Sequence, residues 1–268
     1  MKRLIAAICI LPPLILLVRY GSSAHFLLLL TLVVGMALIE FYRMLAAKGF
    51  PCWEWLGLGI GIILPLAFYV GETASRAAVT SAIVLAFIFS LFARQELAAS
   101  LQSVAFTLLG VFYVGWLLSH VILLRLLTEG TSYVFYIFGV VWLGDAAAMG
   151  VGMWLGRRKL APTISPRKTI EGAIGGAIGS VCAATIGGLW LLQHVTLAQC
   201  LAIGAMLAVL GQLGDLSESV LKRSAGVKDS SAIIPGHGGI LDKVDGILFG
   251  APALYYYVLY VIRPGLSS

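Results

Sequence analysis

Residues 197–245 read LAQCLAIGAMLAVLGQLGDLSESVLKRSAGVKDSSAIIPGHGGILDKVD, and a new apolar run begins at Gly246. The stretch is apolar to about residue 216, which is the length that a helix needs to cross a bilayer. Two membrane-spanning segments therefore enclose a strongly charged loop, 217–245. Charged side chains at a membrane edge are costly unless they bind something. The loop predicts a site for a polyanion or a metal ion.

The composition places the whole chain in a membrane. Hydrophobic residues make up 60% of its 268 residues and charged residues 11%, which excludes a water-soluble domain. The sequence predicts an all-α, polytopic integral membrane protein with about nine spans. The predicted spans are 4–19, 25–46, 56–72, 77–93, 103–127, 132–155, 172–193, 197–216 and 246–262.

The chain reads as a single integrated membrane domain with two regions. Residues 1–130 form N-terminal transmembrane helices, and residues 131–268 form the region that carries the chemistry. The first span follows Lys2 and Arg3, so it also fits a secretory signal, and both interpretations stay open.

Basic residues indicate which side of the membrane holds the loops. With a cytoplasmic N-terminus, 14 of the 18 Lys and Arg residues fall on the inner side. The two long charged loops, 156–171 and 217–245, share that side and are joined by a helical hairpin. We expect them to form one site at the cytoplasmic membrane edge.

Two pairs of carboxylates have a spacing in the sequence that suits ligands of a metal ion. Asp215 and Glu218 are three residues apart, with Lys222 on the same helical face, and Asp242 and Asp245 are also three apart. Glu218 and Lys222 also fit an ordinary surface pair. Two acidic pairs at one membrane edge predict a divalent-metal site.

Phosphate-binding groups are expected in both loops. Gly236, Gly238 and Gly239 surround His237, and such a turn can aim backbone N–H groups at a phosphate. In the other loop, Ser165-Pro-Arg-Lys168-Thr169 offers hydroxyl and ammonium donors near a helix start. The alternative is a tight connection and a basic loop that sets topology.

Three further features lie within or beside the spans. Asp145 is an intramembrane ionisable residue, which indicates function, with a packing hydrogen bond as the alternative. Glu40 and Arg43 are interpreted as an interfacial pair. Glycines spaced four apart in the seventh span predict close helix packing, namely Gly172 with Gly176 and Gly175 with Gly179.

The charged loops resemble the signature of the phosphatidate cytidylyltransferase family, also called CDP-diacylglycerol synthases. The C-terminal match covers Ser219, Leu221, Lys222, Arg223, Lys228, Asp229, Ser231, Ile234, Pro235, His237, Gly238, Gly239, Ile240, Asp242, Val244 and Asp245. Lys243 stands where the family has arginine, so a cation is kept but a bidentate fork is lost. A second match runs from Asp145 to Gly172, with Met149 where relatives often have tyrosine.

The resemblance implies transfer of CMP from CTP to phosphatidate, with Mg²⁺ as cofactor and K⁺ as a candidate second cation. It implies Asp215 and Asp242 as Mg²⁺ ligands supported by Asp245 and Glu218, and catalytic cations at Lys222 and Arg223. The substrate-binding residues would be Ser165, Lys168, Thr169, Ser219, Lys228, His237, Gly238, Gly239, Lys243 and Asp145.

The expected partners follow from the same resemblance. They are CTP, phosphatidate and the lipid bilayer, with no nucleic acid and with a homodimer as a candidate assembly. The expected location is the bacterial inner membrane, with the site facing the cytoplasm.

Two other classes of function remain open from the residues. A CTP-dependent lipid kinase of the polyprenol type would use similar groups but transfer the γ-phosphate. An ion-coupled transporter would use Asp145 and Asp215 as intramembrane sites. CDP-alcohol phosphotransferases are disfavoured because their DGxxAR pattern is missing.

The charge asymmetry generates a topology prediction. Single cysteines placed at Ala161 and Ala225 in a cysteine-free background should resist an impermeant thiol reagent added to intact cells and react after lysis. A reporter fused after Arg263 should read as external. Labelling of either cysteine from outside would reverse the orientation.

Overall fold

A computed structural model describes residues 12–192, 194–231 and 238–263. The chain divides into two compact units that are not contiguous in sequence. The first comprises Met1–Leu126 and Lys222–Val244, and the second comprises Leu127–Leu221 and Asp245–Ser268. The prediction of regions 1–130 and 131–268 stays a prediction, and each unit is described by itself below.

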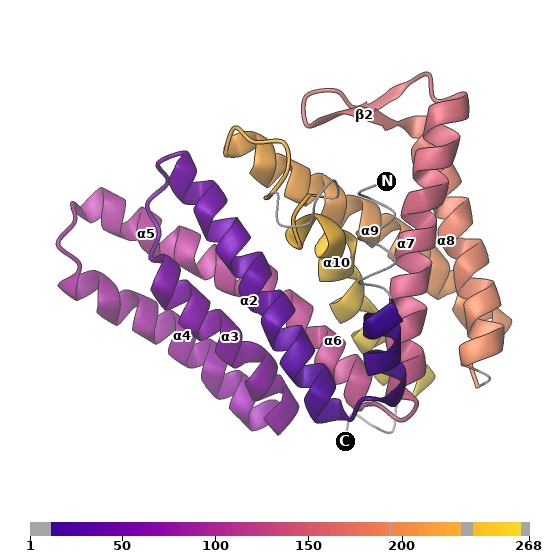
Figure 1. Cartoon of the computed structure of the whole chain (residues 1–268), viewed down its shortest axis with the longest axis horizontal. Helices are drawn as coiled ribbons and strands as arrows, with labels where there is room; N and C mark the ends of the chain where they lie inside the picture. Colours follow the sequence, from indigo (N-terminus) through magenta and orange to yellow (C-terminus); the bar gives the residue numbers. More distant parts are fainter. Residues whose placement is uncertain (1–11, 193, 232–237, 264–268) are drawn as a thin grey trace. The chain divides into compact units, whose positions relative to one another are not determined.

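The first unit is a group of neighbouring helices (Figure 1). After a helical stretch over residues 12–20, its elements are α2 (Ser23–Ala47), α3 (Glu54–Val70), α4 (Glu72–Phe92), α5 (Leu97–Gly110), η1 (Val111–Trp116) and α6 (Leu117–Leu126). The η1 segment is a π-helical turn that joins α5 to α6 without a break. Helix α3 contacts α2, α4, α5 and α6, so it occupies the middle of this group.

Tyr42 is the polar centre of that packing. Its ring is 1% exposed, and its hydroxyl donates to the Thr107 carbonyl oxygen at 2.7 Å. Gly57 and Gly110 face the same ring, and a side chain at either would overlap it. The buried hydroxyl is therefore satisfied by a neighbouring helix, as a low-dielectric interior requires.

The second unit contains α7 (Gly130–Leu155), α8 (Ile170–Leu191), the start of α9 (Leu197–Ser224), and most of α10 (Leu241–Tyr257) with η2 (Val258–Ile262). Between α7 and α8, β1 (Lys159–Ala161) and β2 (Ser165–Thr169) form an antiparallel hairpin, which Figure 1 shows at one end of these helices. No pattern in the sequence predicted these strands.

Local hydrogen bonds fix the hairpin to the start of α8. The Glu171 carboxylate accepts from the backbone N–H groups of Arg157 (3.0 Å) and Arg158 (3.1 Å). Thr169 is the N-cap of α8, and its hydroxyl oxygen accepts from the Gly172 N–H at 3.1 Å. Thr169 therefore satisfies an N–H group that the start of α8 leaves open, and Glu171 ties the beginning of the basic loop to the same helix.

The predicted small-residue packing of the seventh span is confirmed. A Cβ at Gly176 would lie 2.8 Å from the Cβ of Ala148, and one at Gly175 would lie 2.6 Å from the Cβ of Val151. Helices α7 and α8 therefore approach at a separation that only glycine permits at these positions.

Among the described residues, seven helices are long and apolar enough to cross a membrane. They are Ser23–Ala47, Glu72–Phe92, Leu97–Leu126, Gly130–Leu155, Ile170–Leu191, Leu197–Ser224 and Leu241–Ile262. The predicted span 56–72 corresponds to α3, which is shorter at 17 residues, and the predicted span 4–19 lies partly outside the described residues.

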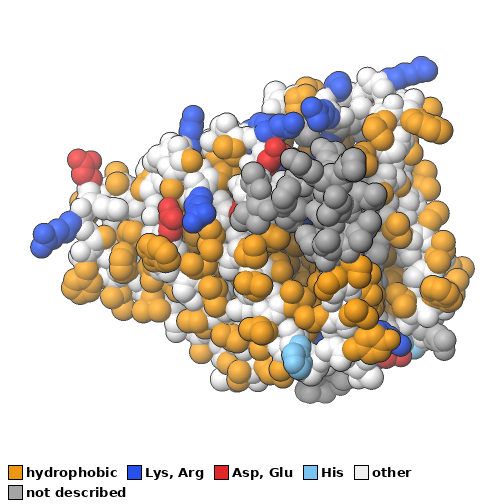
Figure 2. Space-filling model, in the orientation of Figure 1, with side chains coloured by type: hydrophobic (Ala, Val, Ile, Leu, Met, Phe, Trp, Pro, Cys, Tyr) orange, Lys and Arg blue, Asp and Glu red, His pale blue; other side chains and the backbone are white. Residues whose placement is uncertain are grey.

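The surface suits a bilayer. Helix α4 exposes large apolar side chains, including Phe87 at 51% and Phe92 at 80%. Figure 2 shows hydrophobic side chains over this part of the first unit. Such a surface would be unstable in water, and the chain is an integral membrane protein with an all-α fold.

The close packing predicts that an alanine substitution has different effects on stability at two glycines of the second unit. Gly175→Ala should lower the stability by about 1–3 kcal/mol, because its Cβ overlaps Val151. Gly139→Ala is the control, since a Cβ at Gly139 meets nothing within 4 Å. Thermal unfolding in detergent measures both, and equal Tm values would contradict the packing.

Candidate functional site

Three carboxylates gather in the second unit. Asp215 and Glu218 lie on α9 and Asp245 lies on α10, and one ligand oxygen from each falls within 4.8 Å of the others. Glu218 is fully buried, while Asp215 and Asp245 are half-buried. We call these three residues the carboxylate cluster. The sequence predicted these three carboxylates as metal ligands, and the structure brings them together.

Gly214 makes the cluster possible. A Cβ at Gly214 would lie 3.2 Å from the Asp245 carbonyl carbon and 3.3 Å from the Gly246 Cα. Backbone atoms cannot move aside as a flexible side chain can. Glycine at this position therefore lets α9 approach α10 closely enough for Asp245 to join Asp215.

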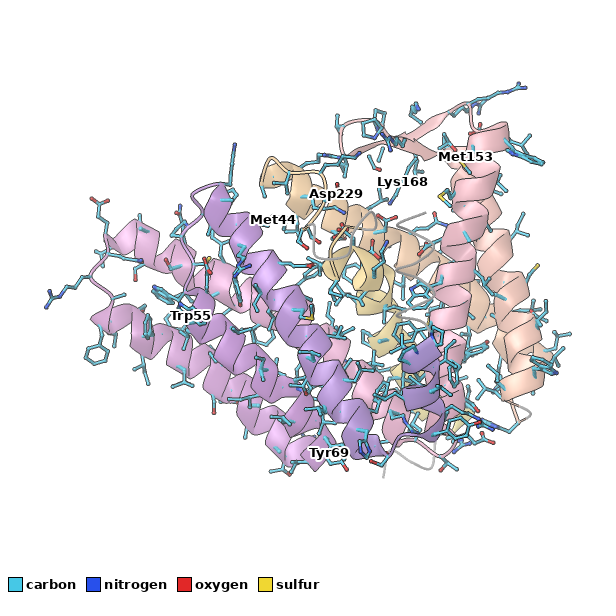
Figure 3. The ribbon with its side chains drawn as sticks, in the orientation of Figure 1. Met44, Trp55, Tyr69, Met153, Lys168 and Asp229 are labelled. Atoms are coloured by element: carbon cyan, nitrogen blue, oxygen red, sulfur yellow. The ribbon has the colours of Figure 1, made fainter. Side chains whose placement is uncertain are left out.

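Lys168 brings a positive charge to the same cluster. Its Nζ lies 2.5 Å from Oδ2 of Asp215, and its side chain is 25% exposed. Figure 3 shows Lys168 at the hairpin, on strand β2. The sequence predicts that the loops 156–171 and 217–245 form one site, and that stays a prediction. Within the second unit, Lys168 of the first loop pairs with Asp215 of α9.

The cluster has the composition of a divalent-cation site. Carboxylates this close repel one another, and a buried carboxylate such as Glu218 is costly without compensation. Oxygen ligands from several carboxylates are those that Mg²⁺ and Ca²⁺ prefer. Asp215, Glu218 and Asp245 therefore have the chemistry to hold a divalent cation such as Mg²⁺, and the predicted Mg²⁺ stays a prediction.

A second polar cluster lies in the first unit and is built on Asp242. Oδ1 of Asp242 accepts from Lys222 Nζ at 2.6 Å, and both side chains are 12% exposed. Oδ2 accepts from the backbone N–H groups of Gly239 (2.7 Å) and Ser230 (3.2 Å). Asp242 thus binds an ammonium group and backbone donors, and its predicted role as a Mg²⁺ ligand stays a prediction.

The glycine-rich turn has the backbone freedom that was expected of it. Gly238 has a φ of 84°, in the left-handed region that favours glycine. A side chain at Gly239 would overlap Ser230 Oγ and Glu40 Oε2. His237, which belongs to the same predicted phosphate site, lies outside the described residues.

Glu40 is the site residue that sequence reasoning missed. Its interpretation as an interfacial partner of Arg43 is wrong, because the Glu40 carboxylate is 2% exposed and binds the glycine-rich turn. It accepts from Ser231 Oγ at 2.6 Å and from the N–H groups of Ile240 and Leu241 at 2.9 Å each. The available signal was an ionisable residue inside an apolar span, which is expensive without a partner.

The remaining predicted residues have these positions. Arg223 donates from Nη1 to the Val227 carbonyl oxygen at 3.1 Å, Ser219 is buried on α9, and Lys243 is half-buried on α10. Lys228 is exposed, and Ser165 opens β2 opposite Ala161. Their predicted contacts with phosphates stay predictions.

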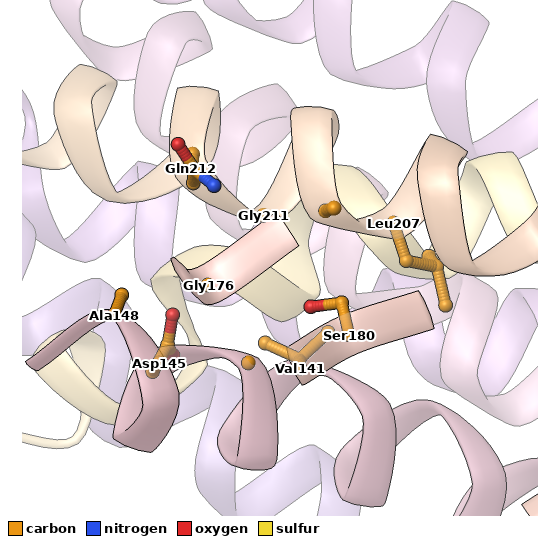
Figure 4. A pocket seen from close by; sticks show the side chains of 10 residues that line it. Val141, Asp145, Ala148, Gly176, Ser180, Leu207, Gly211 and Gln212 are labelled. Carbon is orange, nitrogen blue, oxygen red and sulfur yellow. The ribbon is translucent and has the colours of Figure 1, made fainter. Parts of the chain in front are cut away.

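Asp145 lines a pocket between helices α7, α8 and α9 (Figure 4). Ser180 and Gln212 contribute the other polar side chains, and Gly176 and Gly211 are among the small residues that leave the space. Gln212 Nε2 donates to the Ala173 carbonyl oxygen at 2.9 Å, which ties α9 to α8. The predicted role of Asp145 in substrate binding stays a prediction.

Comparison with known proteins identifies the family. The sequence pattern of the cytidylyltransferase family matches residues 1–261. The chain belongs to this family. Membership covers the N-terminal helices as well as the charged loops, and it makes the chain a cytidylyltransferase-type enzyme.

Curated relatives agree with the family. The chain is similar to a phosphatidate cytidylyltransferase of Synechocystis, 32% identical over 269 residues and 89% of each chain. It is 40% identical to one from Staphylococcus haemolyticus over 194 residues, 72% of this chain and 74% of the relative. One from Bacillus subtilis is 46% identical over 156 residues, 58% of each chain.

The carboxylate cluster predicts metal binding, which can be measured without an activity assay. The protein should bind Mn²⁺, a paramagnetic substitute for Mg²⁺, and Asp245→Asn should weaken that binding about tenfold or more. Lys168→Gln should strengthen it in the absence of nucleotide, because a competing cation leaves Asp215. Electron paramagnetic resonance of free Mn²⁺ measures both.

The matched control is Glu96→Gln, because Glu96 is exposed and its side chain makes no cap hydrogen bond. Unchanged Mn²⁺ affinity in Asp245→Asn would remove that residue from the site.

Proposed function

We propose that this enzyme transfers CMP from CTP to phosphatidate, giving CDP-diacylglycerol and pyrophosphate. The observation that carries the proposal is the carboxylate cluster of Asp215, Glu218 and Asp245 with Lys168 beside it. The relatives are phosphatidate cytidylyltransferases, which supports phosphatidate as the lipid substrate and CTP as the nucleotide donor.

The chemistry suits such a site because the nucleophile is already an anion. A phosphate oxygen of phosphatidate attacks the α-phosphorus of CTP, the new P–O bond forms, and the bond to the β-phosphate breaks with pyrophosphate as leaving group. No strong general base is required. The difficulty is to bring polyanions together, which positioned cations and metal ions solve.

The carboxylate cluster would hold Mg²⁺, which neutralises phosphate oxygens and stabilises the charge that develops on the leaving group. Lys168 lies 2.5 Å from Asp215, so its ammonium is placed to contact a phosphate near the metal. A monovalent cation such as K⁺ is a further candidate at the carboxylates.

Lys222 would contribute a second, separately fixed positive charge. Its ammonium is held by Asp242 at 2.6 Å, in a group that also orders the backbone N–H groups of Gly239 and Ser230. An ammonium group carries three N–H donors and a positive charge, both of which suit phosphate oxygens. Arg223, Lys228 and Lys243 lie on the same segment of the first unit and add to its positive charge.

We propose that the site faces the cytoplasm of the bacterial inner membrane. This rests on the basic residues, of which 14 of 18 fall on the inner side of the predicted nine-span topology, and on the bacterial relatives. CTP is a cytoplasmic nucleotide, so this orientation gives the site access to its donor. A homodimer remains a proposal for the assembly.

The test uses purified protein, phosphatidate, Mg²⁺ and α-labelled CTP, with labelled lipid as the expected product. Asp215→Asn should lower kcat by about a hundredfold or more, because the amide keeps the shape but loses the charge that binds metal. Asp242→Asn should also lower activity, because it releases Lys222.

Parallel assays with γ-labelled CTP provide the control for reaction class. Label in the lipid from γ-labelled CTP alone would indicate a lipid kinase and contradict the proposal. Ion flux in liposomes without nucleotide would indicate a transporter. Near-normal turnover in Asp215→Asn would remove Asp215 from the metal site.

A further inference from the structure

We infer that Glu40, on helix α2, is a positioning residue for the phosphate-binding turn of this enzyme. The inference deepens the proposed function and rests on it. We call the described residues 225–231 and 238–240 the glycine loop. The glycine loop and Glu40 both lie in the first unit, although about 190 residues separate them in sequence.

The carboxylate of Glu40 accepts hydrogen bonds from donors in the glycine loop and at the start of α10. Oε1 accepts from Ser231 Oγ at 2.6 Å and from Ile240 N–H at 2.9 Å. Oε2 accepts from Leu241 N–H at 2.9 Å and lies 3.0 Å from Ser230 Oγ. An ionised carboxylate offers about four acceptor positions, and three donors occupy them here, with the Ser230 hydroxyl shared between Glu40 and Asp242.

Glu40 also completes the start of α10. The N–H groups of Ile240 and Leu241 lie at the helix N-terminus, where backbone donors have no partner within the helix. A negative charge at this end is stabilised by the helix dipole. Glu40 therefore serves as an N-terminal cap supplied by a distant helix, and it fixes where α10 begins.

One hydroxyl links Glu40 to the lysine-binding carboxylate. Ser230 Oγ lies 3.0 Å from Glu40 Oε2 and 2.9 Å from Asp242 Oδ2. A hydroxyl has one hydrogen, so it donates to one carboxylate at a time. Asp242 in turn holds Lys222 at 2.6 Å. The connection runs from Glu40 through Ser230 and Asp242 to the ammonium that we assign to phosphate binding.

Gly239 shows that the turn is fitted around this carboxylate. A Cβ there would overlap Glu40 Oε2, the carboxyl carbon of Glu40, and Ser230 Oγ. The glycine of the predicted phosphate turn is therefore required by the approach of Glu40 as well as by any ligand. A larger side chain at residue 239 and a neutral side chain at residue 40 should both disrupt the contact between Glu40 and the glycine loop.

The test compares Glu40→Gln with the wild-type protein in the full-length chain. The amide keeps the volume but places an N–H₂ group against backbone donors. We expect the KM for CTP to rise about tenfold, with a smaller change in kcat, because the loop is disordered while the carboxylate cluster is intact. Ser231→Ala, which removes one donor, should raise KM about two- to fivefold.

Trypsin cleavage gives a readout that needs no turnover. Lys222, Arg223, Lys228 and Lys243 flank or lie within the glycine loop, and cleavage there should be faster in Glu40→Gln. Glu96→Gln is the matched control, since Glu96 is an exposed glutamate of the same unit, and it should match the wild type in both assays.

The outcomes separate this inference from the proposed function. Wild-type KM and cleavage pattern in Glu40→Gln would overturn the positioning role. If Glu40→Gln does not fold, Ser231→Ala still decides, because unchanged KM and cleavage there would also overturn it. A wild-type protein that forms no labelled lipid would defeat the proposed function, while faster cleavage in Glu40→Gln would still support the contact.

Discussion

A carboxylate buried at the edge of a membrane must be compensated where it lies, and the charged parts of this protein follow from that constraint. Moving an ion from water into a low-dielectric interior costs several kcal/mol unless partners replace the water. In the first unit, hydrogen-bond donors and an ammonium group compensate Glu40 and Asp242. In the second unit, Lys168 compensates Asp215, and the three grouped carboxylates suit a divalent cation.

Glycine supplies the geometry that this compensation needs. At Gly214 it lets the backbones of α9 and α10 approach, so that carboxylates from two helices converge. At Gly239 it leaves room for an incoming carboxylate, and at Gly176 it lets α8 pack on α7. At each position the absence of a side chain allows a close approach between groups that contribute to function or stability.

Much of this arrangement could be predicted from the sequence because it depends on local pattern. Apolar runs identified the spans, the four-residue glycine spacing indicated close packing, and the i, i+3 spacing of Asp215 and Glu218 placed them on one face. The hairpin of β1 and β2 and the contact of Glu40 with residue 241 could not be read in this way. They depend on tertiary packing between distant segments, for which a single sequence carries no periodic signal.

The capping of α10 by Glu40 has a consequence for the order in which the protein is made. Helix α2 leaves the ribosome about 190 residues before the serines that its carboxylate binds. During that interval, Glu40 is an acidic residue in an apolar helix with none of its final donors synthesised. Insertion of α2 must therefore depend on its other side chains. Their favourable transfer free energy outweighs the cost of inserting one acidic residue, which is about 3 kcal/mol. The hydrogen-bond donors for Glu40 come from residues 230–241, so a chain released before these residues are made would leave the Glu40 carboxylate without them in the membrane.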